Sequence, residues 1–131
     1  MKYDPLIARL EEKYHPKQRG FGCLPVSESL ALLVLAEFPG HSVSTAQTRQ
    51  TSREGAIGET NHYVAIVREP TGKLIAMDAT RPSYEDGKDC WTFEAQTEAT
   101  LMTQLSKHYG GEWNIQDKWL HKVPEWYSGF P

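Results

Sequence analysis

Residues 62–80 read HYVAIVREPTGKLIAMDAT, and they are the most strand-like part of the chain. Two runs rich in apolar and β-branched residues, 62–68 and 73–80, flank the turn sequence Glu-Pro-Thr-Gly at 69–72. Short apolar runs on either side of such a turn are typical of a β-hairpin. We therefore predict two antiparallel strands joined by a tight turn.

The register of this hairpin determines whether its two polar ends meet. His62 opens the first strand, and Asp78 lies near the end of the second. If the turn centres near Thr71, paired residue numbers have an even sum, and the two side chains share one face as direct or diagonal neighbours. An odd register would separate them. In the even register the same face carries an apolar patch formed by Val64, Ile66, Leu74 and Ala76.

We expect this patch to pack on a helix that precedes the hairpin in the chain. Residues 27–36 of that helix are apolar around most of its circumference, which suits burial against a sheet. Cys23 lies at the N-terminal end of the helix, Pro25 fits its first turn, and the Phe-Pro-Gly sequence at 38–40 stops it. We predict that this is the central helix of the domain.

The other segments predict an α+β fold around this core. They are a helix from Asp4-Pro5 to His15-Pro16, a strand over 41–48, loops over 50–60 and 84–89, a helix over 94–109, and a short strand with an irregular tail in the last twenty residues. With 131 residues, 39% of them hydrophobic and 11% aromatic, the chain suits a single domain, residues 1–131. The central helix is expected to pack on an antiparallel sheet.

The charge pattern limits the partners that we expect. A formal net charge of −3 with scattered basic residues offers no field for a nucleic-acid backbone, so no nucleic-acid partner is predicted. The N-terminal residues are charged throughout, unlike a signal peptide, and the longest apolar run, 30–36, is too short to span a bilayer. We expect a soluble protein with no membrane span, cytoplasmic or exported by a leaderless route or as part of a larger secreted polypeptide.

Cys23 has the sequence setting of a nucleophile. A helix N-terminus favours the thiolate and offers backbone N–H donors to a developing oxyanion. Gly20 and Gly22 allow close backbone approach just before it, which favours this interpretation over a small apolar residue that fills a gap in the core. In the even register His62 would take the thiol proton and return it to a leaving amine, and Asp78 would orient the ring.

These residues resemble a known family. The chain has Gly22-Cys23 opening an apolar helix, then a strand beginning His62-Tyr63-Val64-Ala65 and a strand ending Met77-Asp78-Ala79-Thr80. This order is similar to the core of transglutaminase-like and papain-like cysteine enzymes, and it covers about residues 20 to 84. The resemblance implies a papain-like or transglutaminase-like fold with Cys23, His62 and Asp78 as nucleophile, base and orienting group. Small bacterial toxins and effectors that deamidate, crosslink or cleave proteins use the same core.

The resemblance also suggests an oxyanion donor and a reaction class. Papain-like proteases have a glutamine shortly before the nucleophile, and Gln18 stands five positions before Cys23, one fewer than the usual papain offset. An Asp as orienting group favours the transglutaminase-like side over the papain-type Asn. The implied function is attack on amide bonds of a protein substrate through a thioester, with glutamine deamidation or transamidation preferred and peptide cleavage as the alternative on the same site.

An alternative from another class is a non-catalytic protein-binding module on the same fold, such as an inhibitor or an immunity-type partner. A degenerate module would be expected to have lost part of the triad, whereas all three residues are present. For the enzyme, the expected partners are a protein substrate and a cognate immunity or inhibitor protein.

The other cysteine and the other histidines are not expected to take part in the reaction. We predict two free thiols, with Cys90 in or beside a loop and not catalytic. No cofactor and no metal are predicted, and a zinc site of Cys23, Cys90 and His62 is the weaker alternative. Surface positions are expected for the four other histidines, which are His15, His41, His108 and His121.

Overall fold

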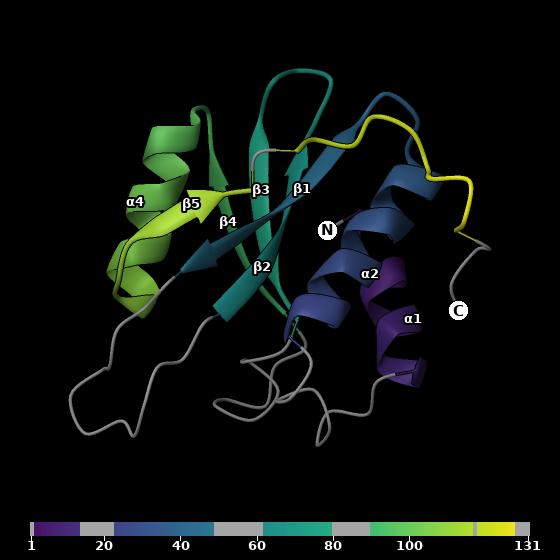
Figure 1. Ribbon diagram of the computed structural model, residues 1–131, viewed down its shortest axis with the longest axis horizontal. Helices are drawn as coiled ribbons and strands as arrows, with labels where there is room; N and C mark the ends of the chain where they lie inside the picture. Colours follow the sequence, from purple (N-terminus) through teal and green to yellow (C-terminus); the bar gives the residue numbers. More distant parts are fainter. Residues whose placement is uncertain (1, 14–22, 49–61, 80–89, 117, 128–131) are drawn as a thin grey trace.

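A computed structural model describes residues 2–13, 23–48, 62–79, 90–116 and 118–127. Within these ranges the elements in chain order are α1 (Asp4–Lys13), α2 (Cys23–Glu37), β1 (Ser42–Thr48), β2 (His62–Arg68), β3 (Leu74–Asp78), β4 (Trp91–Ala95), α4 (Glu98–Tyr109) and β5 (Trp113–Ile115). The predicted α+β class is confirmed at this level. Figure 1 shows the strands as one sheet with α1 and α2 beside it.

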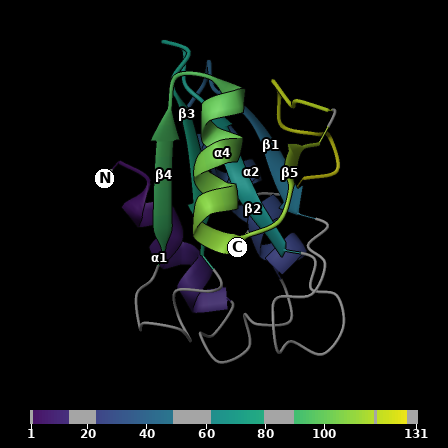
Figure 2. The same ribbon diagram turned by 90° about the vertical axis from the view of Figure 1, so that its left-hand side faces the viewer.

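The sheet has five strands in the order β4-β3-β2-β1-β5, and every neighbouring pair is antiparallel. The helices cover it from both sides, with α4 on one face and α1 and α2 on the other (Figure 2). All five residues of β3 are buried as a result. A strand covered on both faces reads as a continuous apolar run, which is the pattern of this part of the sequence.

The long apolar helix is α2, and it is buried as its composition predicts. Val26, Leu30 and Leu33 are almost inaccessible to solvent and pack with residues of α1 and of the sheet in one core cluster. Burial of each such side chain contributes about 1.5–3 kcal/mol. The helix ends at Glu37, directly before the predicted Phe-Pro-Gly stop. Because α2 is firmly packed, its first residue, Cys23, has a defined place relative to the sheet.

The predicted hairpin is confirmed, and of the two registers considered it has the even one. Ala65 pairs with Met77 and Ile66 with Ala76, so paired residue numbers have an even sum. The turn closes with a 2.8 Å hydrogen bond from the Gly72 N–H to the Glu69 carbonyl, and Gly72 has the positive φ of 94° that favours glycine. Extending this register places Asp78 diagonal to the first residue of β2, on the same face of the sheet.

The prediction about which helix covers that face was wrong. The patch of Val64, Ile66, Leu74 and Ala76 packs with residues of α4, among them Leu101 and Leu105. The opposite face of the hairpin contacts α2 through Ala65, Val67, Ile75 and Met77. Both faces of both strands are apolar, so alternation alone could not show which helix covers which face.

The helix predicted over 94–109 was also wrong at its start. Residues 91–95 form β4, which pairs with β3 from Leu74↔Ala95 to Asp78↔Trp91. The helix α4 begins at Glu98, where the Thr97 side chain caps it by accepting a hydrogen bond from the Thr100 N–H at 3.1 Å. The strand β4 is short and only half apolar. It is stabilised by pairing with β3, and a prediction from the local sequence pattern does not take that pairing into account.

The first helix, the strand after α2 and the short C-terminal strand are found as α1, β1 and β5. The tail after β5 stays beside the sheet, where Leu120 forms an antiparallel bridge with Val43. The loops predicted over 50–60 and 84–89, and the predicted end of the first helix at His15-Pro16, lie outside the described residues. Among the described residues, no helix combines the length and apolar content needed to cross a bilayer.

Candidate active site

Three elements bring the triad residues to one end of the sheet. Cys23 is the first residue of α2, His62 is the first of β2, and Asp78 is the last of β3. Figure 1 shows that α2 begins at the end of the sheet where β2 begins. The antiparallel hairpin places its two polar residues at that same end, because the start of one strand lies beside the end of the other.

His62 and Asp78 form a direct, buried pair. The His62 Nε2 atom lies 2.8 Å from Asp78 Oδ2, and the residues are only 5% and 1% exposed. A buried carboxylate without partners would be strongly unfavourable, so this hydrogen bond compensates for the burial of Asp78. It also holds the imidazole in one orientation and leaves Nδ1 as the ring nitrogen available to the Cys23 thiol.

Cys23 is half-buried and interacts with His62. Burial raises the pKa of the Cys23 thiol, but the hydrogen bond and charge of His62, together with the backbone N–H groups of Tyr63 and Leu24, lower it more. The pKa of Cys23 therefore lies below its ordinary value. A thiolate stabilised by an imidazole and by backbone donors is the reactive form of a nucleophilic cysteine.

Tyr109 is a site residue that the sequence analysis missed. Its hydroxyl donates a 2.5 Å hydrogen bond to Asp78 Oδ2, the same oxygen that His62 binds. Its ring centre lies 5.1 Å from that of His62, and the ring centre of Trp113 lies 6.0 Å from that of His62 and 5.2 Å from that of Tyr109. The available signal was the spacing of four between Leu105 and Tyr109, which puts the tyrosine on the buried face of α4.

The other candidate residues do not join this group in the described part of the chain. Gln18, the candidate oxyanion donor, and the glycines Gly20 and Gly22 lie outside the described residues. Cys90 is a half-buried free thiol just before β4, and its Sγ donates to the Trp91 carbonyl at 3.5 Å. No set of three or more His, Cys, Asp or Glu side chains in the described ranges is arranged to hold a metal ion.

The expectation that the other histidines lie on the surface was wrong for His41. This residue is 6% exposed, and neither ring nitrogen has a hydrogen-bond partner among the described residues. Its ring packs beside the rings of Phe38 and Tyr3, with ring centres 5.3 Å and 6.3 Å away. His108 and His121 are exposed as predicted, and His15 lies outside the described residues.

Comparisons of the chain with protein-family models, with curated proteins and with solved structures found no match. A thiol with a lowered pKa, an imidazole beside it and a buried carboxylate behind the imidazole form the arrangement that nucleophilic catalysis at a carbonyl carbon requires.

Proposed function

We propose that this chain is a cysteine-dependent enzyme that attacks amide carbonyls through a thioester intermediate. Cys23 is the nucleophile, His62 is the general base and acid, and Asp78 is the orienting group, on a core of the papain-like or transglutaminase-like kind. The observation that most strongly supports the proposal is the 2.8 Å hydrogen bond between the buried side chains of His62 and Asp78, beside a Cys23 thiol whose pKa His62 lowers.

In the acylation half of the proposed reaction, the Cys23 sulfur attacks the carbonyl carbon of the amide and forms a C–S bond. The proton of the thiol is held by His62, which carries a positive charge at this stage. The tetrahedral intermediate collapses when the C–N bond breaks and His62 gives its proton to the leaving nitrogen. The products of this half are a thioester on Cys23 and ammonia or an amine.

In the deacylation half, water or a primary amine attacks the thioester carbonyl and His62 accepts its proton. The C–S bond then breaks, and the thiolate of Cys23 is restored. Water gives a carboxylate, and an amine gives a new secondary amide. We propose glutamine deamidation or transamidation of a protein as the reaction, because the orienting group is Asp78, the type found on the transglutaminase-like side. Peptide cleavage at the same residues is the alternative.

A substrate assay tests this proposal and separates the alternatives. The chain is incubated with an unfolded protein rich in glutamine, with and without a fluorescent primary amine, and the products are analysed by mass spectrometry. We expect conversion of glutamine to glutamate without the amine, and covalent amine adducts when it is present. New chain termini would indicate the peptidase.

The matched control in this assay is Cys23→Ser, which keeps the size of the side chain and removes the reactive sulfur. Product formation that persists in Cys23→Ser would exclude Cys23 as the nucleophile. Absence of all three products with the unmodified chain, across several protein substrates, would favour the non-catalytic binding module instead.

A further inference from the structure

A groove of about 760 Å³ lies on the α2 face of the sheet, next to the start of α2. One wall is a single face of α2, formed by Leu24, Glu28 and Leu32 at the four-residue spacing of a helix. The floor is one face of β1, with Val43 and Thr45 among its residues. This volume is within the range of sites that hold ligands.

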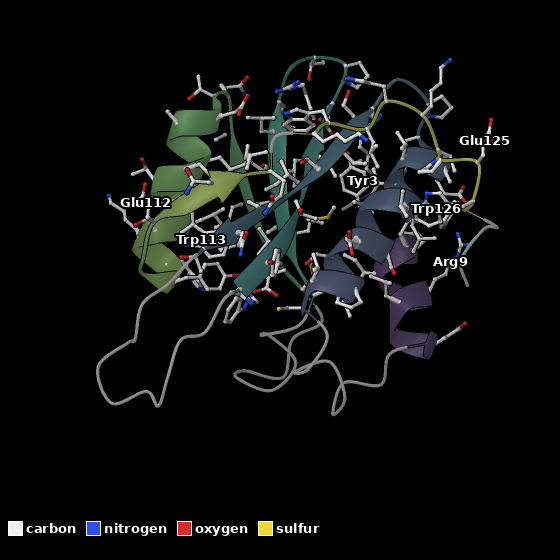
Figure 3. The ribbon with its side chains drawn as sticks, viewed as in Figure 1. Tyr3, Arg9, Glu112, Trp113, Glu125 and Trp126 are labelled. Atoms are coloured by element: carbon white, nitrogen blue, oxygen red, sulfur yellow. The ribbon has the colours of Figure 1, made fainter. Side chains whose placement is uncertain are left out.

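The opposite wall is the tail after β5. It includes Leu120, which is fixed to β1 by a pair of backbone hydrogen bonds with Val43, and Trp126. Figure 3 shows Trp126 on the tail beside α2. Trp126 is 75% exposed, so a large aromatic surface stands free at this wall. Tryptophan is one of the residue types enriched among those that contribute most to binding at interfaces.

One end of the described groove lies next to Cys23, whose thiol interacts with the backbone of Leu24 and Tyr63. Leu24 and Tyr63 line the groove, and they are the chain neighbours of Cys23 and His62. The groove then follows α2 away from Cys23 toward Leu32 and the tail. From Leu24 to Leu32 the helix rises about 12 Å, a length that an extended peptide covers with about four residues.

The lining indicates what kind of chain would bind. Among the described residues, the charged side chains that line the groove are one acid, Glu28, and one base, Lys118, so this described lining carries no net charge. Near the floor the Gln116 amide donates to the Gln47 carbonyl at 2.8 Å. This pairing leaves the amide nitrogen of Gln47 and the carbonyl oxygen of Gln116 able to bond a peptide backbone. Most of the other lining side chains are apolar or aromatic.

We infer that this groove binds an extended, uncharged and mainly apolar segment of the protein substrate, and that the bound segment carries the adjoining carboxamide to Cys23. The inference rests on the proposed function, because it assigns the substrate class of the same nucleophile. Trp126 covers the bound segment from the tail, and the paired glutamines Gln47 and Gln116 align its backbone.

The test uses three thiol reagents that share one reactive group. They are bromoacetamide, a bromoacetyl tetrapeptide amide of alternating leucine and valine, and a bromoacetyl tetrapeptide amide of alternating serine and asparagine. In each case the thiolate displaces bromide, and the labelling rates of Cys23 and Cys90 are followed separately by mass spectrometry. We expect the apolar peptide to label Cys23 at least about tenfold faster than the polar peptide, with saturation, and Cys90 to show no such preference.

Two variants locate this preference in the groove. Trp126→Ala should reduce the apolar preference at Cys23 roughly fivefold to tenfold, as truncation of an anchoring aromatic does. Thr45→Phe should also reduce the apolar preference, because the larger side chain occupies space at the floor of the groove. Phenylalanine is a residue that β-strands accommodate. The matched control is Val123→Ala, which removes an exposed apolar side chain from the same tail outside the groove and should leave the preference unchanged.

The outcomes separate this inference from the proposed function. Fast labelling of Cys23 by bromoacetamide without any preference between the peptides would overturn the groove assignment alone. The groove assignment would also be overturned if Trp126→Ala and Val123→Ala change the apolar preference by the same factor. It would likewise be overturned if light scattering shows that the apolar peptide only causes the chain to self-associate. If bromoacetamide labels Cys23 no faster than Cys90, the proposed function is contradicted and the groove inference is overturned with it.

Discussion

Asp78 is the residue at which the contacts of the candidate site converge. Both His62 and Tyr109 bind its Oδ2 atom, from β2 and from α4 respectively. Two donors on one buried oxygen offset the cost of removing the carboxylate from water. They also restrict the rotation of the carboxylate, so the ring of His62 has one favoured orientation.

We expect Asp78→Asn to reduce the rate of the amide reaction by orders of magnitude, up to about 10⁴-fold, as loss of the orienting carboxylate does in similar triads. The amide keeps the shape of the carboxylate but cannot stabilise the imidazolium form of His62. The measurement is kcat/KM on the substrate found in the amine-incorporation assay. A rate close to that of the unmodified chain, with a melting temperature that shows an intact fold, would remove Asp78 from the mechanism.

Tyr109→Phe tests the proposed positioning of Asp78. The variant retains the ring that packs on His62 and removes one hydrogen bond, so the free energy of unfolding should fall by about 1 kcal/mol. We expect kcat to fall roughly twofold to tenfold with KM unchanged, because Tyr109 acts through Asp78 and does not touch the substrate. A change in KM with unchanged kcat would instead place Tyr109 at the substrate.

At the scale of elements, the sequence predicted the helices and strands whose formation depends on the local residue pattern. The hairpin and the helix that begins at Cys23 follow from alternation, turn residues and composition. The sequence left two registers open, and the even one found in the structure places His62 and Asp78 on one face. The strand β4 was missed, because its stability comes from pairing with β3. Without β4, the true start of α4 and the contact of Tyr109 with Asp78 could not be predicted.

The cap of α4 gives a prediction at this scale. Thr97→Ala removes the side chain that accepts the Thr100 N–H, so the free energy of unfolding should fall by about 1 kcal/mol. The matched control is Thr103→Ala, an exposed threonine inside the same helix, which should be neutral or slightly stabilising because alanine has the higher helix propensity. Chemical denaturation of both variants measures the difference. Equal stabilities would contradict the assigned cap.

At the scale of the whole molecule, helices cover both faces of the sheet, and the candidate site lies at the sheet's end. His62 contacts Tyr109 on the α4 side, while Cys23 belongs to α2 on the other side. His62 and Cys23 come together at the end of the sheet where β2 begins. The sequence could not predict this arrangement, because both faces of β2 and β3 are apolar and either helix could have covered either face.

This arrangement also explains why the pKa of Cys23 depends on a balance. Burial at the end of the sheet raises the pKa of the thiol, and the hydrogen bond and charge of His62 together with the backbone donors lower it more. The thiolate should therefore form at a lower pH than in an ordinary cysteine. If His62 is removed, the effect of burial is opposed only by the backbone donors, and the pKa of Cys23 should rise.

The pH dependence of Cys23 alkylation by iodoacetamide tests the central claim most directly. Cys90 in the same chain is the internal reference, and His62→Ala is the matched variant. The account predicts that Cys23 reacts faster than Cys90 near neutral pH, and that its reaction reaches half of the maximal rate below the ordinary thiol value of about 8.5. It also predicts that His62→Ala moves this midpoint to higher pH. Equal rates for the two cysteines, or a Cys23 midpoint that does not change in His62→Ala, would contradict the account.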